Sequence, residues 1–382
     1  MSVRERLGFV AAFGAAMALG GCGDGEGGTS GDPRGLQQPC DIDSGYDGDD
    51  LCIEPPPPEE GFQLHFGPES YDEADVEPYL IQPGEENVEC IYLNTPNDTE
   101  VWVNEYHGRM RPGTHHMITY VLDEDIPDND TPTECGFGDV GSTFLLGSQE
   151  STVDIAASDA APEHAGYALR IAPNQQARIE LHYINTTSEP ILREAWINVG
   201  VTPPSEVTKQ MSPLFWIAEL GKVVEERTTD FMRGDCVVPE NAPEDLELVQ
   251  VTGHFHAHTT RMTAWLTDAD RAEPCTMGLM PGEESLEGCT RIYEGYDYTD
   301  PGWIRFDSIT DNPEPDPDQR VPGSEWDGNL PLEPGQRIDW ECRIEAEEDD
   351  LPFANGAQDA EMCNIFGVYA PSMGGEPWSC VN

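Results

Sequence analysis

Hydrophobic and polar residues alternate over short runs along most of the chain. Alternation with a period of two is typical of β-strands that bury one face. Four such runs are TEVWVNEYHGRM (99–110), HHMITYVL (115–122), ARIELHYIN (177–185) and RMTAWLTD (261–268). Gly, Pro, Asn and Asp residues, which favour turns, separate them. Stretches with the helical period of 3.6 residues are scarce. The pattern therefore predicts an all-β fold of antiparallel β-sandwiches.

The strand-like pattern is interrupted near the middle of the chain, at VGVTPPSEV (199–207), by two adjacent prolines. The 382 residues are enough for two domains and a tether. No segment repeats at a fixed period. We therefore expect two β domains, at 61–204 and 205–382.

The N-terminal residues have a different pattern. MSVRERLGFVAAFGAAMALGGC has two arginines, an apolar stretch too short to span a bilayer, and a Leu-Gly-Gly-Cys sequence. This order is typical of a bacterial lipoprotein signal. We expect residues 1–21 to be the signal peptide and Cys22 to carry the lipid, with ordinary signal cleavage nearby as the alternative.

Residues 22–60 are rich in Gly, Asp and Pro and end in EPPPPEE, so they predict a flexible, disordered tether. No later stretch is apolar enough to cross a membrane. The sequence therefore predicts an exported lipoprotein, periplasmic or at the cell surface. Its contact with the membrane would be the lipid on Cys22.

The cysteine count agrees with export. Of eleven cysteines, removal of Cys22 leaves ten, an even number that an oxidising compartment can pair as five disulfides. The short spacings of Cys40 with Cys52 and of Cys275 with Cys289 favour local disulfides. Spacing alone leaves the pairing of the others open.

The charge excludes some partners. The chain has 74 acidic and 19 basic residues and a formal net charge of −55, which disfavours nucleic acid and anionic membrane surfaces. We interpret the excess as a highly solvated surface, which includes a long acidic loop at 310–328. Calcium binding is the alternative, although DIDSGYDGDD (41–50) lacks the EF-hand spacing.

Three histidines alternate in VTGHFHAHTT (251–260). In a regular strand, His254, His256 and His258 would share one face. Imidazoles at positions i and i+2 can bind one metal ion, and only two of the three need be ligands. This stretch is therefore a candidate metal site.

Other candidate ligands are weaker when taken alone. The side chains of His115 and His116 would diverge in a regular strand and could converge only at a strand end or bulge. His182 falls on the polar face of its run, which is typical of a surface residue. Met362 in EMCNIFGVY has the pattern of a core residue, but as a ligand its thioether would select copper, chiefly Cu(I), over zinc.

Taken in order, the motifs HHM, LHY, HFH and MCN resemble those of the copper type II, ascorbate-dependent monooxygenases. This is the family of peptidylglycine α-hydroxylating monooxygenase and dopamine β-monooxygenase. The resemblance covers roughly residues 62–382. It implies two copper ions per chain, with dioxygen and ascorbate or another one-electron donor as co-substrates of a small molecule.

The resemblance assigns the ligands to two sites. His115, His116 and His182 would hold the copper that stores an electron. The site of dioxygen activation and substrate hydroxylation would consist of His254, His256 and Met362. His258 would lie beside that site or replace His254, and Asn364 would contact the substrate.

The same resemblance implies a fold and three further disulfides. The fold would be two jelly-roll-like β-sandwiches, with one copper on each, facing across a solvent-filled cleft. The disulfides would be Cys90–Cys135, Cys236–Cys380 and Cys342–Cys363. The last of these would hold Met362 in place through its neighbour.

The sequence departs from the peptide-amidating members of the family at two positions. Those enzymes use an arginine and a tyrosine to hold a peptide carboxylate, and this chain has Thr252 and Phe366 there. A peptide carboxylate is therefore not the expected substrate, and the sequence nominates no other.

Two other classes of function remain as alternatives. One is a surface lipoprotein that binds or scavenges copper without catalysis. The other is a zinc hydrolase or hydratase with a three-histidine site. Met362 and the lack of an obvious carboxylate base beside the histidines disfavour zinc. Copper-dependent hydroxylation of a C–H bond is the function that we expect.

Overall fold

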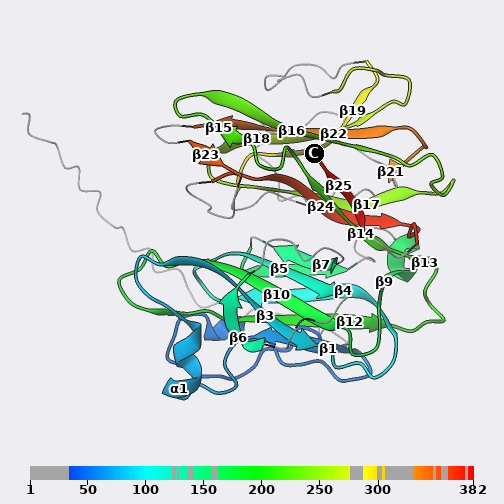
Figure 1. The fold of residues 1–382 in the computed structure, drawn as a ribbon. Helices are drawn as coiled ribbons and strands as arrows, with labels where there is room; N and C mark the ends of the chain where they lie inside the picture. Colours follow the sequence, from blue (N-terminus) through cyan, green and yellow to red (C-terminus); the bar gives the residue numbers. More distant parts are fainter. Residues whose placement is uncertain are drawn as a thin grey trace, which may run out of the picture.

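A computed structural model gives the fold (Figure 1). It describes residues 34–122, 126, 129–135, 142–148, 150–156, 162–275, 287–298, 303–305, 330–346, 350–353, 360–374 and 377–382. The expected signal peptide, Cys22 and the acidic loop 310–328 lie outside these residues. Among the described residues, no helix is long and apolar enough to cross a membrane.

The N-terminal half forms two sheets that enclose one core. In one sheet the order is β1 (Gly61–Phe66), β12 (Ala195–Thr202), β4 (Val101–Met110), β9 (Tyr167–Ile171) and β13 (Lys209–Gln210), with β8 (Thr152–Ala156) paired to β4. In the other it is β6 (Asn129–Glu134), β3 (Glu86–Asn94), β10 (Gln176–Ile184), β5 (Thr114–Leu122) and β7 (Ser142–Ser148).

The C-terminal half forms a second sandwich. Its first sheet has the order β20 (Trp303–Arg305), β17 (Glu247–Phe255), β24 (Cys363–Ala370), β14 (Ser212–Ile217) and β25 (Trp378–Val381), with β21 (Leu330–Pro331) paired to β17. Its second sheet has the order β16 (Thr229–Val237), β22 (Arg337–Glu345), β18 (Thr259–Thr267) and β19 (Cys289–Gly295).

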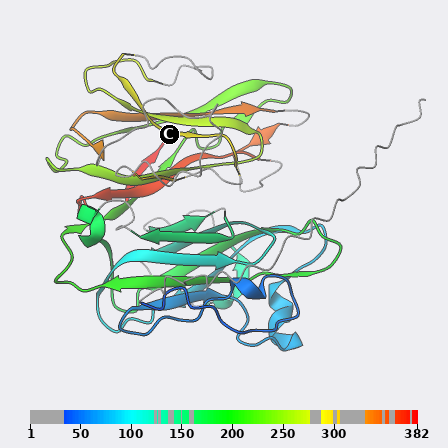
Figure 2. The same cartoon turned by 180° about the vertical axis from the view of Figure 1, so that it is seen from behind.

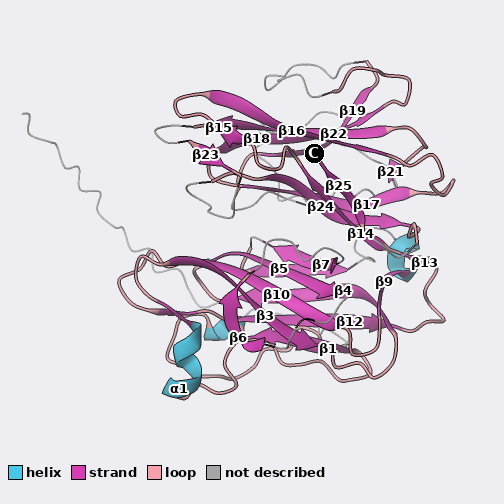
Figure 3. Ribbon diagram, viewed as in Figure 1, coloured by secondary structure: helices cyan, strands magenta, loops and turns pink. Residues whose placement is uncertain are grey.

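Short elements complete the described fold. Two-stranded sheets join β2 (Leu80–Ile81) to β11 (Ile191–Leu192) and β15 (Val223–Val224) to β23 (Leu351–Pro352). The described helices are α1 (Glu73–Val76), η1 (Asp49–Leu51), η2 (Glu77–Tyr79) and η3 (Pro162–Gly166). Strands dominate the remainder (Figure 3). The all-β sandwich prediction is confirmed, but β13 pairs with β9, and β14 with β25, in parallel rather than antiparallel.

The predicted alternation explains which side chains enter the first core. In β10, Ile179, Leu181 and Tyr183 are fully buried between the two N-terminal sheets. The period of two turns the residues between them to the opposite face. That face carries His182 and its strand partner His116, whose ring lies 5.2 Å from that of His254 in the C-terminal sandwich. Figure 2 shows the two sandwiches stacked on each other.

Aromatic stacking joins the two sandwiches. Phe366 of β24 lies between Phe144 of β7 and Phe215 of β14, with ring centroids 5.2 and 4.9 Å apart and planes within 9° of parallel. At another part of the interface, the Tyr167 hydroxyl of β9 donates to Glu247 of β17 at 2.6 Å. These contacts place the β5–β7 side of the first sandwich directly against β14, β17 and β24 of the second.

The segment 34–60 corrects the expected tether. Leu36, Cys52 and Ile53 are at most 5% exposed. The Asn198 side chain donates to the carbonyl groups of Leu36 and Glu54 at 2.7 and 2.8 Å. The predicted tether is therefore wrong for residues 34–60, which pack on the first sandwich. The polar composition of this stretch concealed the few apolar residues that anchor it.

The five disulfides follow the predicted pairing, which is confirmed in full. They are Cys40–Cys52, Cys90–Cys135, Cys236–Cys380, Cys275–Cys289 and Cys342–Cys363. Each links cysteines within one half of the chain. The described residues of each sandwich therefore carry their own covalent links.

Candidate metal centre

A β-bulge brings the first group of histidines together. In the ladder between β5 and β10, His182 pairs with His116 and Tyr183 pairs with Thr114, so His115 is the extra residue. A bulge redirects the side chain of such a residue. This is the irregularity that the adjacent histidines needed in order to converge. The rings of His115 and His116 lie 4.9 and 5.0 Å from that of His182.

The three side chains present nitrogen atoms to a common point. One nitrogen from each of His115, His116 and His182 lies within 4.8 Å of the other two. His115 Nε2, His116 Nδ1 and His182 Nδ1 are buried and have no hydrogen-bond partner among the described residues. Unpaired buried polar atoms are costly unless something satisfies them. A metal ion that accepts three imidazole lone pairs fits this requirement.

Carboxylates orient two of these rings. Glu86 Oε1 lies 2.8 Å from His182 Nε2, and Glu180 Oε1 lies 3.5 Å from His116 Nε2. A carboxylate accepts the proton of the ring nitrogen that faces it, which leaves Nδ1 as a lone pair. Carboxylate–histidine pairs of this kind orient many metal ligands. The geometry therefore sets the tautomer that a metal requires.

Burial keeps the cluster uncharged. Burial, followed by the nearby His182 and His256, lowers the pKa of His115 to about 3. Burial also holds the pKa of His116 well below its usual value, and it lowers the pKa of His182 despite the opposing effect of Glu86. Neutral imidazole is the metal-binding form. These side chains are therefore ready to bind a cation at neutral pH without first losing protons.

The second group of candidate ligands is His254, His256 and Met362. His254 lies on one face of β17 and β24. His254 pairs with Asn364, and Thr252 pairs with Phe366. Because side chains alternate along a strand, these four residues face the N-terminal sandwich together. Burial, followed by the neighbouring His256, lowers the pKa of His254 well below its usual value. His254 is therefore also a neutral candidate ligand.

His256 and Met362 stand just beyond the ends of these two strands. The ladder ends where Phe255 pairs with Cys363, so His256 and Met362 are the next residues on either side. His256 is fully buried and Met362 is 7% exposed. His256 Nδ1 lies 3.2 Å from the carbonyl oxygen of Ala360, and the two histidine rings of this group are 5.3 Å apart. The structure thus brings His254 and His256 together, and Met362 lies at the end of the strand that pairs with theirs.

His258 corrects the prediction of three histidines on one strand face. The strand ends at Phe255, and the N–H of Thr259 donates to the carbonyl oxygen of His256 at 3.1 Å. His258 therefore lies in a tight turn and is only partly buried. Period-two alternation does not continue through a turn, so the shared face is limited to His254 and His256.

The two groups contact each other. The ring of His116 lies 5.2 Å from that of His254, and the rings of His115 and His256 are 6.1 Å apart. The five histidines of both groups are 0–7% exposed. The expected solvent-filled cleft between the sites is therefore wrong for this structure. The aromatic stack around Phe366 closes the two sandwiches on each other.

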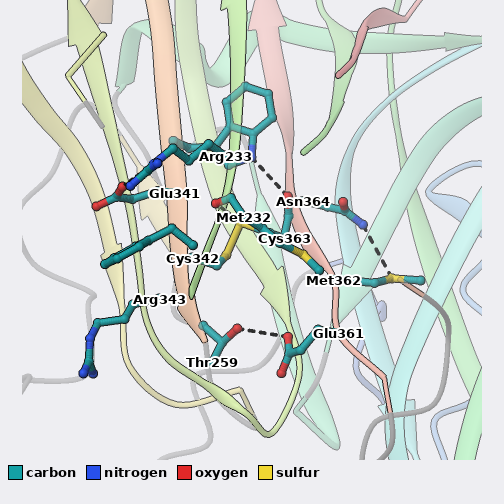
Figure 4. Close-up of a disulfide and its surroundings, with 12 residues drawn as sticks. Met232, Arg233, Thr259, Glu341, Cys342, Arg343, Glu361, Met362, Cys363 and Asn364 are labelled. Atoms are coloured by element: carbon teal, nitrogen blue, oxygen red, sulfur yellow. Dashed lines mark hydrogen bonds and ion pairs between the residues drawn. A yellow bond between two sulfur atoms is a disulfide. The ribbon is translucent and has the colours of Figure 1, made fainter. Parts of the chain in front are cut away.

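A disulfide and an amide support Met362 (Figure 4). Cys363 is bonded to Cys342 of β22, and the indole N–H of Trp340 donates to the Cys363 carbonyl oxygen at 3.1 Å. The Asn364 side-chain nitrogen lies 3.6 Å from the Met362 sulfur. The amide thus contacts the thioether, while Asn364 Oδ1 is buried without a partner among the described residues.

Sequence reasoning missed several residues around the candidate ligands. Glu86 and Glu180 contact histidines, and Glu361 contacts the turn after β17. Tyr298, from the C-terminal half, lies 5.5 Å from His115. Glu361 precedes Met362 directly and could have drawn notice for that reason. Glu180 stands two residues before His182, on the face that alternation assigns to both, so it could also have been found. Glu86 and Tyr298 are remote in sequence from the histidines that they contact.

Comparisons with known proteins add little. No known family model matches the sequence, and no characterised protein matches it. The chain is similar to an archaeal-virus protein with a triple jelly roll fold, at 9% identity and a TM-score of 0.19, over 85% of this chain and 62% of that one. It therefore spans less than two thirds of that protein.

Two solved structures of PNGase F are also similar. One, a glycosylasparaginase from Flavobacterium meningosepticum, has 9% identity and a TM-score of 0.29 over 81% of this chain and 96% of that one. The other, recombinant N-glycanase F, has 8% identity and a TM-score of 0.30 over 84% of this chain and 97% of that one. Likenesses this weak carry no argument about function.

Proposed function

We propose that this protein is a copper type II, ascorbate-dependent monooxygenase that hydroxylates a C–H bond of a small substrate. Dioxygen and ascorbate, or another one-electron donor, are its co-substrates. The observation that carries the proposal is the convergence of His115, His116 and His182, through the bulge, beside a second group that contains His254, His256 and Met362. These six residues come from four separate motifs. The contacts among the five histidines and the place of Met362 beside the last strand pair of β17 and β24 support the proposal.

The donor set favours copper over other metals. Imidazole suits several transition metals, whereas the thioether of Met362 favours Cu(I). Met362 is only 7% exposed, and the Asn364 amide lies beside its sulfur. Copper in these sites would supply the one-electron chemistry that dioxygen requires. Zinc has no redox chemistry and gains nothing from a thioether, so the zinc alternative is weaker.

The chain's own groups have distinct roles in this proposal. Glu86 and Glu180 hold the proton at Nε2 of His182 and His116, which keeps Nδ1 of both rings available. The C-terminal sandwich covers these rings and excludes water from them. Exclusion of water protects reactive intermediates from side reactions.

Residues beside the second group support a proposal about the substrate class. The ring of Phe366 lies 5.6 Å from that of His254, and it stacks between two other phenylalanines. Thr252 opposite it carries no charge. The buried Oδ1 of Asn364 is a candidate acceptor for one substrate donor. We therefore propose a neutral, apolar or amine substrate and not a peptide carboxylate.

We also propose that the protein is an exported lipoprotein, periplasmic or at the cell surface, anchored through Cys22. Five disulfides within the described residues support an oxidising compartment, because cytosolic proteins rarely keep structural disulfides. The lipobox-like sequence before Cys22 supports the anchor. The domains 61–204 and 205–382 would each contribute one copper site.

A second candidate function is copper binding without catalysis. The 0–7% exposure of the five histidines favours it, because a substrate must reach the second site. Oxygen uptake with ascorbate across a panel of neutral and amine substrates separates the two. The monooxygenase proposal predicts hydroxylated product in proportion to oxygen consumed, and loss of both with His182→Ala or Met362→Ala. Copper binding with no coupled product from any substrate would support the second candidate.

A further inference from the structure

Glu361 is a fully buried carboxylate next to the candidate ligand Met362. Its Oε1 accepts the backbone N–H of His258 at 2.8 Å. Its Oε2 accepts the backbone N–H of His256 at 3.2 Å and the hydroxyl of Thr259 at 2.9 Å. Figure 4 shows the carboxylate pointing at Thr259, with Met362 following on the same segment. Both oxygens therefore accept hydrogen bonds from the turn that follows β17.

The position of this carboxylate is significant because the strand ladder stops there. The last backbone pair between β17 and β24 is Phe255 with Cys363. His256 and Met362 lie one residue beyond that pair, where ladder hydrogen bonds no longer fix their separation. Glu361 spans this gap from the Met362 side to the His256 side. The approach of His256 Nδ1 to the Ala360 carbonyl oxygen provides a second link across it.

The backbone of Glu361 is itself fixed. Its N–H donates to the carbonyl oxygen of Pro352 at 2.9 Å, and it forms an isolated parallel bridge with Phe353. A buried carboxylate is costly unless it is fully hydrogen-bonded. Three donors meet that requirement here, and all three belong to the turn.

We propose that Glu361 is a positioning residue that holds His256 and Met362 at the separation required for one copper ion. This inference rests on the proposed function. The carboxylate acts through the backbone of the turn and does not touch the metal or the substrate. Loss of its hydrogen bonds would let the turn move away from Met362 and would weaken the second site while leaving the first site intact.

The test compares copper binding in the full-length wild-type protein, Glu361→Gln and a matched control. The glutamine amide has one acceptor oxygen in place of two, and its NH2 group faces backbone donors. The control is Asp339→Asn. Asp339 is a fully buried carboxylate of the same sandwich that also accepts a backbone N–H, from Cys275 at 2.9 Å, and a threonine hydroxyl, from Thr267.

Two measurements are made on each reduced, copper-loaded protein. Competition with a Cu(I) chelator gives the affinity of each of the two ions, and X-ray absorption at the copper edge reports a sulfur ligand. In Glu361→Gln, we expect the affinity of one ion to fall about 10- to 100-fold, as is typical for loss of a residue that supports a ligand. The sulfur signal should decrease with it, and the other ion should bind as in wild type.

The outcomes separate the inference from a general loss of stability. Asp339→Asn should bind both ions normally even if it melts at a lower temperature. Equal loss of the second ion in both variants would overturn the inference, and so would a wild-type sulfur signal and affinity in Glu361→Gln. If Glu361→Gln does not fold, Thr259→Val replaces it. That variant should show a smaller loss at the same ion, and unchanged affinity would overturn the inference. A wild-type protein without sulfur-coordinated copper would overturn the proposed function as well.

Discussion

Acid should destabilise the copper-free protein in part through His115, and His115→Gln should remove the contribution of this residue. Burial, with the nearby His182 and His256, lowers the pKa of His115 from 6.5 to about 3. In the unfolded chain this histidine binds a proton below about pH 6.5, whereas in the folded protein it stays neutral until about pH 3. The unfolded state therefore gains stability as the pH falls through this window.

The magnitude follows from proton linkage. Each unit of pH below 6.5 costs about 1.36 kcal/mol of folding free energy for one histidine that titrates only when unfolded. Between pH 6.5 and pH 5 the difference is 1.5 units, so His115 should contribute a loss of about 2 kcal/mol. Above pH 6.5 it should contribute no pH dependence, because it is neutral in both states.

The assay is urea unfolding at pH 7.5, 6 and 5 in the presence of a metal chelator. Wild type should lose about 2 kcal/mol more stability than His115→Gln between pH 7.5 and pH 5. The control is Thr119→Val, which alters a buried side chain of the same strand without removing an ionisable group. The free energy of unfolding of this control should change with pH as that of wild type does. Parallel curves for wild type and His115→Gln would refute the burial argument.

Three other variants test separate parts of the account. Met362→Leu conserves side-chain volume, so the free energy of unfolding should change by less than about 1.5 kcal/mol. The Cu(I) affinity of one ion should fall, and an unchanged affinity would exclude Met362 as a ligand. Cys363→Ser should lose copper at that same site at temperatures where far-ultraviolet circular dichroism still reports the native fold. In wild type, a free thiol at Cys342 or Cys363 in peptide mapping would contradict the disulfide. Cys22→Ser should move the protein from the membrane fraction to the soluble fraction, and unchanged partition would place the anchor elsewhere.

Local patterns predicted much of the fold. Alternation in β10 correctly separated the buried face of Ile179, Leu181 and Tyr183 from the face of His182. The adjacency of His115 and His116 correctly required a bulge if both were to converge. Both inferences succeed because the direction of a side chain along a strand depends on the local backbone.

The predictions that failed depend on contacts remote in sequence. Alternation at His254 and His256 gave no sign that the strand would end before His258. Average composition marked 34–60 as a tether, although a few apolar side chains such as Leu36 suffice to anchor it. The contact between the two histidine groups depends on how Phe366 packs against the other sandwich, which no single stretch of sequence encodes.

Metal analysis of the purified full-length protein tests whether the chain holds two copper sites. We expect two copper ions per chain, because the two groups of candidate ligands lie on two different sandwiches. His115→Ala should retain one of the two, and that ion should keep its sulfur ligand. One copper per wild-type chain, or zinc in both sites, would contradict a two-copper protein.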